Sequence, residues 1–193
     1  MRLAWLTDIH LNFVDDAGRV RFWETVRPQA DALVITGDIA ESPTIAAHLV
    51  EMDRLLGLPV YFVLGNHDFY RGSIAETRAT IARVAQQSQH LVYLSQTDAI
   101  ELTPSTALVG HDGWADGHFG DFDRSEVVLN DYLLIEELSR RWSLGLDKPA
   151  LREALHALGD EAAGHLARVL GDAAARYPHV IVATHVPPFR ETA

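Results

Sequence analysis

The feature that most constrains the fold of this chain is an apolar run at residues 59–64, followed directly by Gly65-Asn66-His67-Asp68. A β-branched and aromatic run of this length, flanked by proline and glycine, predicts a buried strand. Three similar runs also end in polar residues, and they lie at residues 3–6, 32–35 and 180–183. Because ligands of open α/β sheets bind beyond the carboxyl ends of the strands, we expect one site at that edge. The side chains delivered to it are Asp8, His10, Asp38, Asn66, His67 and His185.

The segments around these first runs predict helices that connect parallel strands. We expect helices over residues 20–29, 42–57 and 73–87, from apolar residues at helical spacing. Pro43 suits the first helical turn after a cap at Ser42, and Ser73 suits an N-cap. The short return from the second helix to the next strand fits a right-handed crossover in a parallel sheet.

The second half of the chain predicts three short strands, one long loop and two helices. The strands lie at residues 91–94, 99–102 and 106–109. A segment rich in Gly, Asp, His and Phe, residues 115–123, predicts a loop near the site. We expect a helix from a cap at Ser125 through Leu138, a break at residues 142–149, and one long or broken helix over residues 151–173.

Composition limits the class of protein. The chain has 193 residues and 48% hydrophobic composition, enough for the core of one domain, residues 1–193. Its formal charge of -11, from 27 acidic and 16 basic residues, disfavours binding of long nucleic acid by phosphate neutralisation. The absence of cysteine excludes disulfides, thiolate zinc sites and cysteine nucleophiles.

The sequence shows neither a signal peptide nor an apolar run approaching the roughly 20 residues of a membrane span. We therefore expect a cytoplasmic protein without membrane partners.

The convergent side chains have the chemistry of a metal site. Carboxylate, amide and imidazole groups suit Mn, Fe, Zn, Ni or Co ions, with Mn favoured. Asp8 and His10, two residues apart after a strand, leave the backbone on the same side. Asp38 has two carboxylate oxygens and could bridge two ions about 3.5–4 Å apart, which would acidify a bridging water. Since Asp and Gly are also common turn formers, a turn role is the alternative for any one of these residues.

Four sequence blocks together resemble the calcineurin-like metallophosphoesterases, in order and in strand context. The resemblance extends over residues 6–188, and its blocks are Asp8-x-His10, Gly37-Asp38, Gly65-Asn66-His67-Asp68 and His185. It implies a four-layer α/β/β/α sandwich, with the C-terminal strands of that fold either present or missing, and a centre of two divalent metal ions.

The resemblance also implies a role for each residue. Asp8 and His10 would hold one ion. Asn66 and His185 would hold the other, and Asp38 would bridge the two.

The two residues after Asn66 would act on the leaving group. His67 would protonate the leaving alkoxide, with Asp68 orienting its imidazole.

The chain departs from the family pattern at its end. That pattern closes with Gly-His-x-His after the His185 strand, and the sequence reaches Ala193 without it. The Gly-His pairs all lie upstream, at His111, His118 and His165, and none has a histidine two residues later. Either the chain is a fragment, or it is a shortened variant with a weakened or different metal site. A missing final strand would leave a sheet edge open to a partner or a second copy.

Other residues have less specific interpretations. His111 and His118 either contact substrate or brace loops. Trp114 either lines a pocket or packs in the core. The acidic residues between Asp112 and Asp123 lack the spacing of a calcium loop. We expect packing roles for Trp5, Trp23 and Trp142, and surface or core positions for His48, His90, His156, His165 and His179.

The leading hypothesis is a metal-dependent phosphoesterase that hydrolyses a phosphomonoester or phosphodiester by attack of a metal-bridging hydroxide. The ions and Asn66 would stabilise the developing charge. The acidic composition favours small substrates, and a nuclease would need a basic groove that the sequence does not show. The rival from another class is a non-catalytic interaction module, which would have no use for His67. A homo-oligomer is left open.

Overall fold

The computed structural model describes residues 1–143 and 147–189, and all of their side chains except those of residues 142 and 143. The first half of the chain alternates strands and helices. Its elements are β1 (Leu3–Leu6), α1 (Asp16–Val26), β2 (Ala32–Thr36), α2 (Ser42–Leu56), β3 (Val60–Val63), α3 (Ile74–Gln87) and β4 (Leu91–Tyr93). These strands form a parallel sheet in the order β1-β2-β3-β4.

The second half forms another sheet, of order β5-β6-β7. Its elements are β5 (Ile100–Thr103), β6 (Thr106–His111), α4 (Asp131–Leu134), α5 (Glu136–Ser143), α6 (Lys148–Ala174) and β7 (His179–Thr184). The pair β5–β6 is antiparallel, whereas β6–β7 is parallel, with α4, α5 and α6 in the connection. Within the described ranges β7 pairs only with β6.

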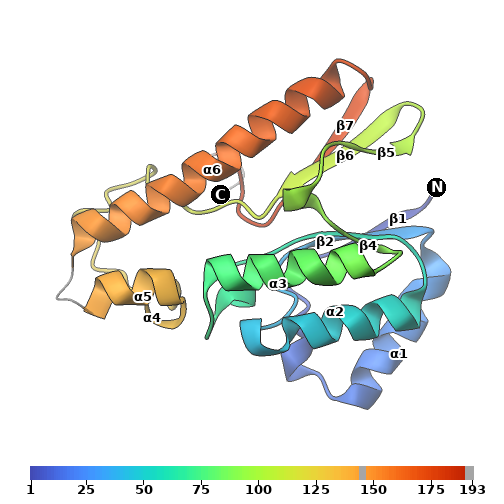
Figure 1. Cartoon of the computed structure of the whole chain (residues 1–193), viewed down its shortest axis with the longest axis horizontal. Coiled ribbons are helices and arrows are strands. Elements are labelled where there is room, and N and C mark those ends of the chain that lie inside the picture. The colour runs from blue at the N-terminus through green and yellow to red at the C-terminus, as the bar shows by residue number, and fades with distance from the viewer. Residues whose placement is uncertain (144–146, 190–193) are drawn as a thin grey trace.

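The helices and sheets stack in layers because each element buries its apolar face against a neighbour (Figure 1). Helices α1–α3 pack on one face of the first sheet around buried residues such as Leu33, Ile35 and Phe62. The two sheets meet through a smaller cluster that contains Val34 and Leu108. Helix α6 covers the outer face of the second sheet. The predicted α/β/β/α sandwich is therefore confirmed.

The helix boundaries in the first half follow local sequence signals. In α2, every third or fourth residue is buried, and Gly57 ends the helix in the left-handed conformation at φ 58°. Ser73 caps α3 by accepting a hydrogen bond from the Glu76 N–H at 3.3 Å, as predicted. Two starts differ by a few residues. Ser42 is the first residue of α2 rather than its cap, and α1 begins at Asp16 because Asp15 supplies the N-cap.

The predicted helix from Ser125 to Leu138 is wrong. Residues 125–130 are not helical, and Ile135 is extended, which separates α4 from α5. The cause is tertiary, since Ile135 forms a parallel bridge with Gly72 and the Glu136 N–H donates to the Gly72 carbonyl at 3.0 Å. Local helical spacing could not reveal this pairing with Gly72, which lies far away in the sequence.

The expected helix over residues 151–173 is one continuous helix, α6. Among the described residues, no helix combines the length and apolar character needed to cross a membrane.

The packing roles predicted for three tryptophans have different outcomes. Trp23 is buried at 1% exposure, as expected. Trp5 is 69% exposed, so its predicted packing role is wrong. It lies on the edge strand β1 and donates its indole N–H to the Thr36 hydroxyl at 2.9 Å. The side chain of Trp142 lies outside the described residues.

Candidate metal centre

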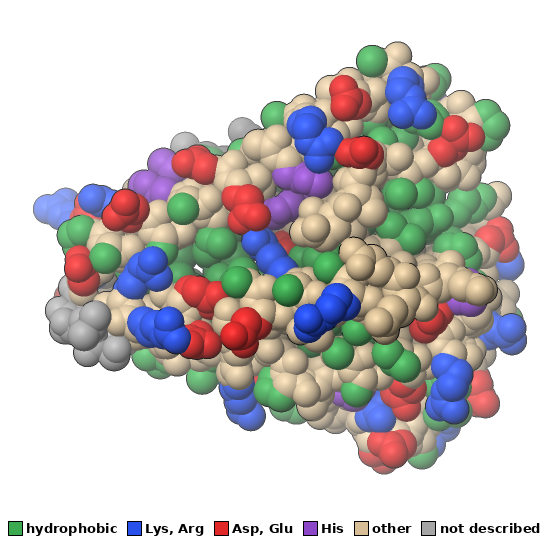
Figure 2. Space-filling view, in the orientation of Figure 1, with side chains coloured by type: hydrophobic (Ala, Val, Ile, Leu, Met, Phe, Trp, Pro, Cys, Tyr) green, Lys and Arg blue, Asp and Glu red, His purple; other side chains and the backbone are tan. Residues whose placement is uncertain are grey.

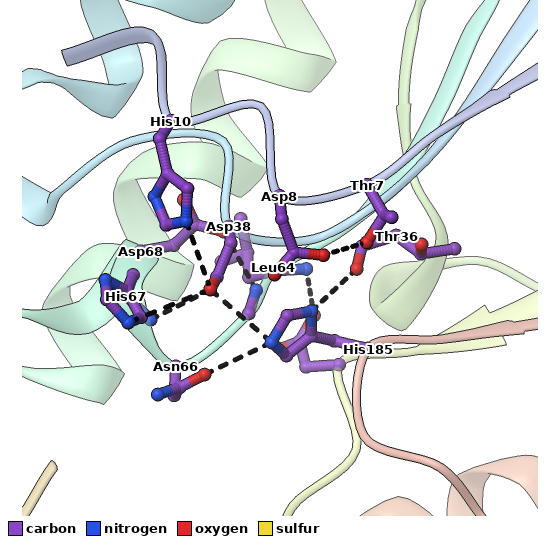
Figure 3. A network of polar contacts seen from close by, with 12 residues as sticks. Thr7, Asp8, His10, Thr36, Asp38, Leu64, Asn66, His67, Asp68 and His185 are labelled. Carbon is purple, nitrogen blue, oxygen red and sulfur yellow. Dashed lines mark hydrogen bonds and ion pairs between the residues drawn. The ribbon is translucent and has the colours of Figure 1, made fainter. Parts of the chain in front are cut away.

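The predicted site residues meet at the carboxyl ends of four strands. Asp8 and His10 follow β1, Asp38 follows β2, Asn66 and His67 follow β3, and His185 follows β7. In Figure 3 the side chains of these residues point toward one another around Asp38. The structure thus brings together all six residues that the sequence directed to this edge.

The loops after β1 and β2 have strained backbones. Asp8, His10 and Asp38 have φ angles of 53°, 41° and 52°, in the left-handed region that is rare for residues other than glycine. Each such residue costs about 1–3 kcal/mol, and they cluster at functional sites. Backbone hydrogen bonds hold the two loops together, from Asp8 N–H to the Gly37 carbonyl at 3.2 Å and from His10 N–H to the Asp38 carbonyl at 3.0 Å. The surrounding fold therefore holds these side chains in place before any ligand binds.

Glycine is required where the β2 and β3 loops touch. Gly37 has a φ of 89°, and a Cβ there would lie 2.6 Å from the Gly65 backbone nitrogen. A Cβ on Gly65 would lie 2.6 Å from the Asp38 backbone nitrogen. No side chain fits at such distances, so both glycines let Asp38 approach the β3 loop.

The potential ligand atoms fall into two groups that share Asp38. One group is His10, Asp38 and His67, the other is Asp8, Asp38 and His185, and the ligand atoms within each lie within 4.8 Å of one another. Asp38 is buried, and its two oxygens face different histidines. Oδ2 lies 3.8 Å from His10 Nε2, and Oδ1 lies 3.4 Å from His185 Nε2. This geometry suits a carboxylate that bridges two cations.

The structure groups Asp8 with His185, whereas the resemblance assigned Asp8 and His10 to the same ion. The division of ligands between two ions stays a prediction.

The hydrogen bonds of His185 indicate that a cation fits between these groups. Its Nδ1 lies 2.7 Å from the Thr36 carbonyl oxygen. Because a carbonyl only accepts, the proton of a neutral His185 is on Nδ1, which leaves a lone pair on Nε2. That lone pair faces two oxygens, Asn66 Oδ1 at 3.1 Å and Asp38 Oδ1 at 3.4 Å. Three electron-rich atoms that converge in this way can serve together as ligands of one cation.

His67 lies at the rim of the centre. Its backbone N–H donates to Asp38 Oδ1 at 3.0 Å, and its Nε2 lies 3.9 Å from Asp38 Oδ2. The imidazole stacks on Tyr70, with ring centroids 4.2 Å apart, and contacts the His10 ring edge to face at 4.9 Å. Its side chain is 34% exposed, so the imidazole is accessible from solvent.

Asp68 does not have its predicted contact. Its carboxyl group is fully buried and accepts from the Ala40 N–H and the Gly65 N–H, both at 2.8 Å. Burial raises the pKa of Asp68 well above its usual value. Among the described side chains, the ring of His67 is held by Tyr70 rather than by a hydrogen bond from Asp68. Asp68 instead joins the β2 and β3 loops. Its expected role in orienting the His67 imidazole stays a prediction, which no contact between the two described side chains supports.

Sequence reasoning missed two acidic residues beside the centre. Asp112 is 1% exposed and accepts a hydrogen bond from the Leu64 N–H at 2.8 Å, directly before the Gly65 turn. Its position after strand β6 was an available signal, because each metal candidate also follows a strand. Asp131 accepts from Asn66 Nδ2 at 2.8 Å. Nothing in the local sequence distinguishes Asp131 from any other acidic residue at a helix start.

The structure shows the surroundings of His111 and His118, for which the sequence left two roles possible. His111 is buried at 3% exposure, and its Nδ1 accepts from the Gly113 N–H at 3.1 Å, which braces the turn after β6. Burial lowers the pKa of His111 below its usual value. His118 lies in the exposed loop, where it pairs with Asp116 at 2.7 Å and stacks on His156 at 4.0 Å. Neither histidine belongs to the two groups around Asp38.

A cavity of about 190 Å³ adjoins the centre. Asn66, Asp131 and His185 contribute to its wall, together with Trp114, which also packs against Phe69 at 5.9 Å between ring centroids. Trp114 therefore has both of the roles considered for it.

The fold and the site define a class of protein, namely an α/β/β/α sandwich with Asp, His and Asn side chains gathered for divalent cations at its strand ends. The comparisons with known proteins agree. Residues 1–192 match the family described as Calcineurin-like phosphoesterase, and the chain belongs to this family. No curated protein matches the chain.

The chain is similar to a solved structure described as the crystal structure of phosphopantetheinyl hydrolase (PptH) from Mycobacterium tuberculosis. It shares 17% sequence identity with this chain at a TM-score of 0.69, and the alignment covers 99% of this chain and 70% of that one. At this identity the likeness shows a shared fold.

Proposed function

We propose that this protein is a phosphoesterase that hydrolyses a small phosphomonoester or phosphodiester with the help of two divalent cations. The observation that carries the proposal is the convergence of the His185 Nε2 lone pair, Asn66 Oδ1 and Asp38 Oδ1 at 3.1–3.4 Å. When bound, the cations would supply positive charge to the phosphoryl oxygens and lower the pKa of water. Family membership supports the same reaction class.

The residues of the chain would divide the remaining work. Asp38 and His185 would hold the cations, with His185 fixed in its tautomer by the Thr36 carbonyl. Asp8, His10 and Asn66 would complete the ligand set. His67, stacked on Tyr70 at the rim, would give a proton to the leaving oxygen.

The charge distribution favours a small substrate over a polynucleotide. The chain carries a formal charge of -11. On the face in Figure 2, Lys and Arg side chains are scattered among Asp and Glu rather than gathered into a stripe. A nuclease would need such a basic stripe along its groove.

The first experiment measures hydrolysis of 4-nitrophenyl phosphate and of bis(4-nitrophenyl) phosphate by the purified chain, with Mn²⁺ and with a chelator. We expect turnover only with the metal, and a loss of about 100-fold or more in Asp38→Asn, which keeps the size of the side chain but not its charge. Asp172→Ala, which removes an exposed carboxylate on α6, is the control and should retain full turnover. Metal binding without turnover on either substrate would favour the non-catalytic module.

The second experiment tests His67. Nitrophenolate leaves without a proton, whereas an alkoxide needs one. His67→Ala should therefore lose about 10²–10⁴-fold in turnover of an alkyl phosphate ester and much less with the nitrophenyl ester, at unchanged Mn²⁺ content. Equal losses on both substrates would contradict the role of His67 as the acid.

A further inference from the structure

Asp131 contacts two residues of the β3 loop although it is 65 positions from Asn66 in the sequence. One oxygen, Oδ1, accepts hydrogen bonds from Asn66 Nδ2 at 2.8 Å and from the Tyr70 hydroxyl at 2.7 Å. The Tyr70 oxygen in turn lies 3.2 Å from Asn66 Nδ2. The amide nitrogen of Asn66 thus has two acceptors on the side away from the metal centre.

This arrangement decides which end of the Asn66 amide faces the centre. A carboxamide has a donor end and an acceptor end of nearly the same shape, and half a turn exchanges them. A carboxylate only accepts, so Asp131 selects the orientation in which Nδ2 faces outward. Oδ1 then faces His185 Nε2, at 3.1 Å. Only the oxygen can serve a cation, since an amide nitrogen bears protons and has no available lone pair.

The same carboxylate reaches His67 through Tyr70. The Tyr70 hydroxyl donates to Asp131, and its ring stacks on the His67 imidazole with an interplanar angle of 29°. Asp131 therefore holds both the amide of Asn66 and the aromatic surface that supports His67.

The segment that carries Asp131 is firmly attached to the rest of the fold. The Arg71 N–H donates to the Leu134 carbonyl at 2.7 Å, at the end of α4. Six residues after α4 begins, Glu137 accepts from the Ser73 hydroxyl at 2.7 Å and from the Ile74 N–H at 2.9 Å, at the start of α3. Although burial acts in the opposite direction, these hydrogen bonds lower the pKa of Glu137. A charged carboxylate thus fixes α5, and with it α4, against the start of α3.

We infer that Asp131 is a positioning residue that presents Asn66 Oδ1 to the metal centre and keeps Tyr70 against His67. The inference rests on the proposed function only for the existence of a cation site. It assigns a task in the site to the segment that connects β6 with β7, which contributes none of the predicted ligands.

The test compares Mn²⁺ binding to metal-free Asp131→Ala, Asp131→Asn and the unchanged chain by calorimetry. We expect Asp131→Ala to weaken Mn²⁺ binding by about 10–100-fold, the usual cost of losing a residue that orients a ligand. Asp131→Asn should recover binding to within about threefold, because an asparagine can turn its own oxygen toward the same two donors. Leu133→Ala, an exposed position on the same helix, is the control and should bind as the unchanged chain does.

Two readouts separate positioning from general damage. The unfolding midpoint of each variant, measured without metal, should stay close to that of the unchanged chain, since Asn66 Nδ2 keeps the Tyr70 oxygen as a partner. Tyr70→Phe should leave Mn²⁺ binding nearly unchanged, because the Asp131 contact to Asn66 remains.

Several results would overturn the inference. The inference is wrong if Asp131→Ala binds Mn²⁺ as tightly as the unchanged chain. It is also wrong if Asp131→Asn binds Mn²⁺ as weakly as Asp131→Ala, because that result would indicate a role for the charge of Asp131 instead of amide orientation. If the unchanged chain binds Mn²⁺ but hydrolyses neither ester, the proposed function fails while the binding comparison still decides the role of Asp131. An unchanged chain that binds no Mn²⁺ would overturn both.

Discussion

Replacing Asp112 by alanine is the sharpest stability test that the structure offers. This 1% exposed carboxylate accepts four hydrogen bonds from side chains and backbone. Oδ1 accepts from the Leu64 N–H and the Ser95 hydroxyl, both at 2.8 Å. Oδ2 accepts from Arg78 Nε at 3.0 Å and from the Tyr93 hydroxyl at 2.6 Å. The group joins β3, α3 and the turns after β4 and β6.

The expected cost follows from what the substitution leaves behind. The Arg78 side chain is 13% exposed, and without Asp112 its remaining ion pair is with Glu161, which is 55% exposed. Breaking a buried ion pair on one side costs about 3–5 kcal/mol. For a domain of this size each kcal/mol lowers the unfolding midpoint by about 2–4 °C. Asp112→Ala should therefore unfold about 6–20 °C below the unchanged chain.

A graded series makes the reasoning testable. Asp112→Asn keeps an acceptor for the Leu64 N–H but places an amide group near Arg78, so its cost should be smaller, about 1.5–3 kcal/mol. The assay is urea and thermal unfolding followed by circular dichroism in the presence of a chelator. Asp172→Ala is the control and should fall within about 0.5 kcal/mol of the unchanged chain.

A double substitution separates the ion pair from the other contacts. Combined with Arg78→Met, Asp112→Ala should cost less than the sum of the two single changes, because each single change leaves a buried charge unpaired. Strict additivity, or a cost below about 1 kcal/mol for Asp112→Ala, would refute the assigned role of this group.

Three further predictions concern the site and the pH dependence of stability. Gly65→Ala should weaken Mn²⁺ binding by about 100-fold, because the added Cβ would displace Asp38. The control is Gly164→Ala on α6, where an added Cβ has no atom within 4 Å, and this variant should bind Mn²⁺ as the unchanged chain does. Glu137→Gln should lower the free energy of unfolding by about 1–2 kcal/mol at pH 7. Since the folded pKa of Glu137 lies below its usual 4.5, this difference should shrink as the pH falls below about 4.5, and a constant difference in urea titrations would contradict it. Buried His111 has a pKa below its usual 6.5, so the metal-free chain should lose stability as the pH falls below 6.5, and His111→Asn should reduce that slope.

Much of the architecture could be predicted from local sequence. The apolar runs at residues 3–6, 32–35 and 180–183 are strands, and the helical spacing after Pro43 and Ser73 gives α2 and α3. Such signals are reliable because a side-chain period and a helix cap act within a few residues. The helix expected from Ser125 was wrong because such local signals do not report contacts between distant residues. The bridge between Gly72 and Ile135, which interrupts that helix, joins residues far apart in the chain.

The centre itself shows the same division. The sequence by itself determined which chemical groups gather at one edge, because polar residues placed directly after parallel strands must emerge together. Only the tertiary structure decided their orientation. Thr36 fixes the tautomer of His185, Asp68 joins two loops, and Asp131 turns the amide of Asn66. Each of these contacts joins segments that are distant in the sequence. No local sequence pattern encodes the hydrogen-bond geometry between such segments.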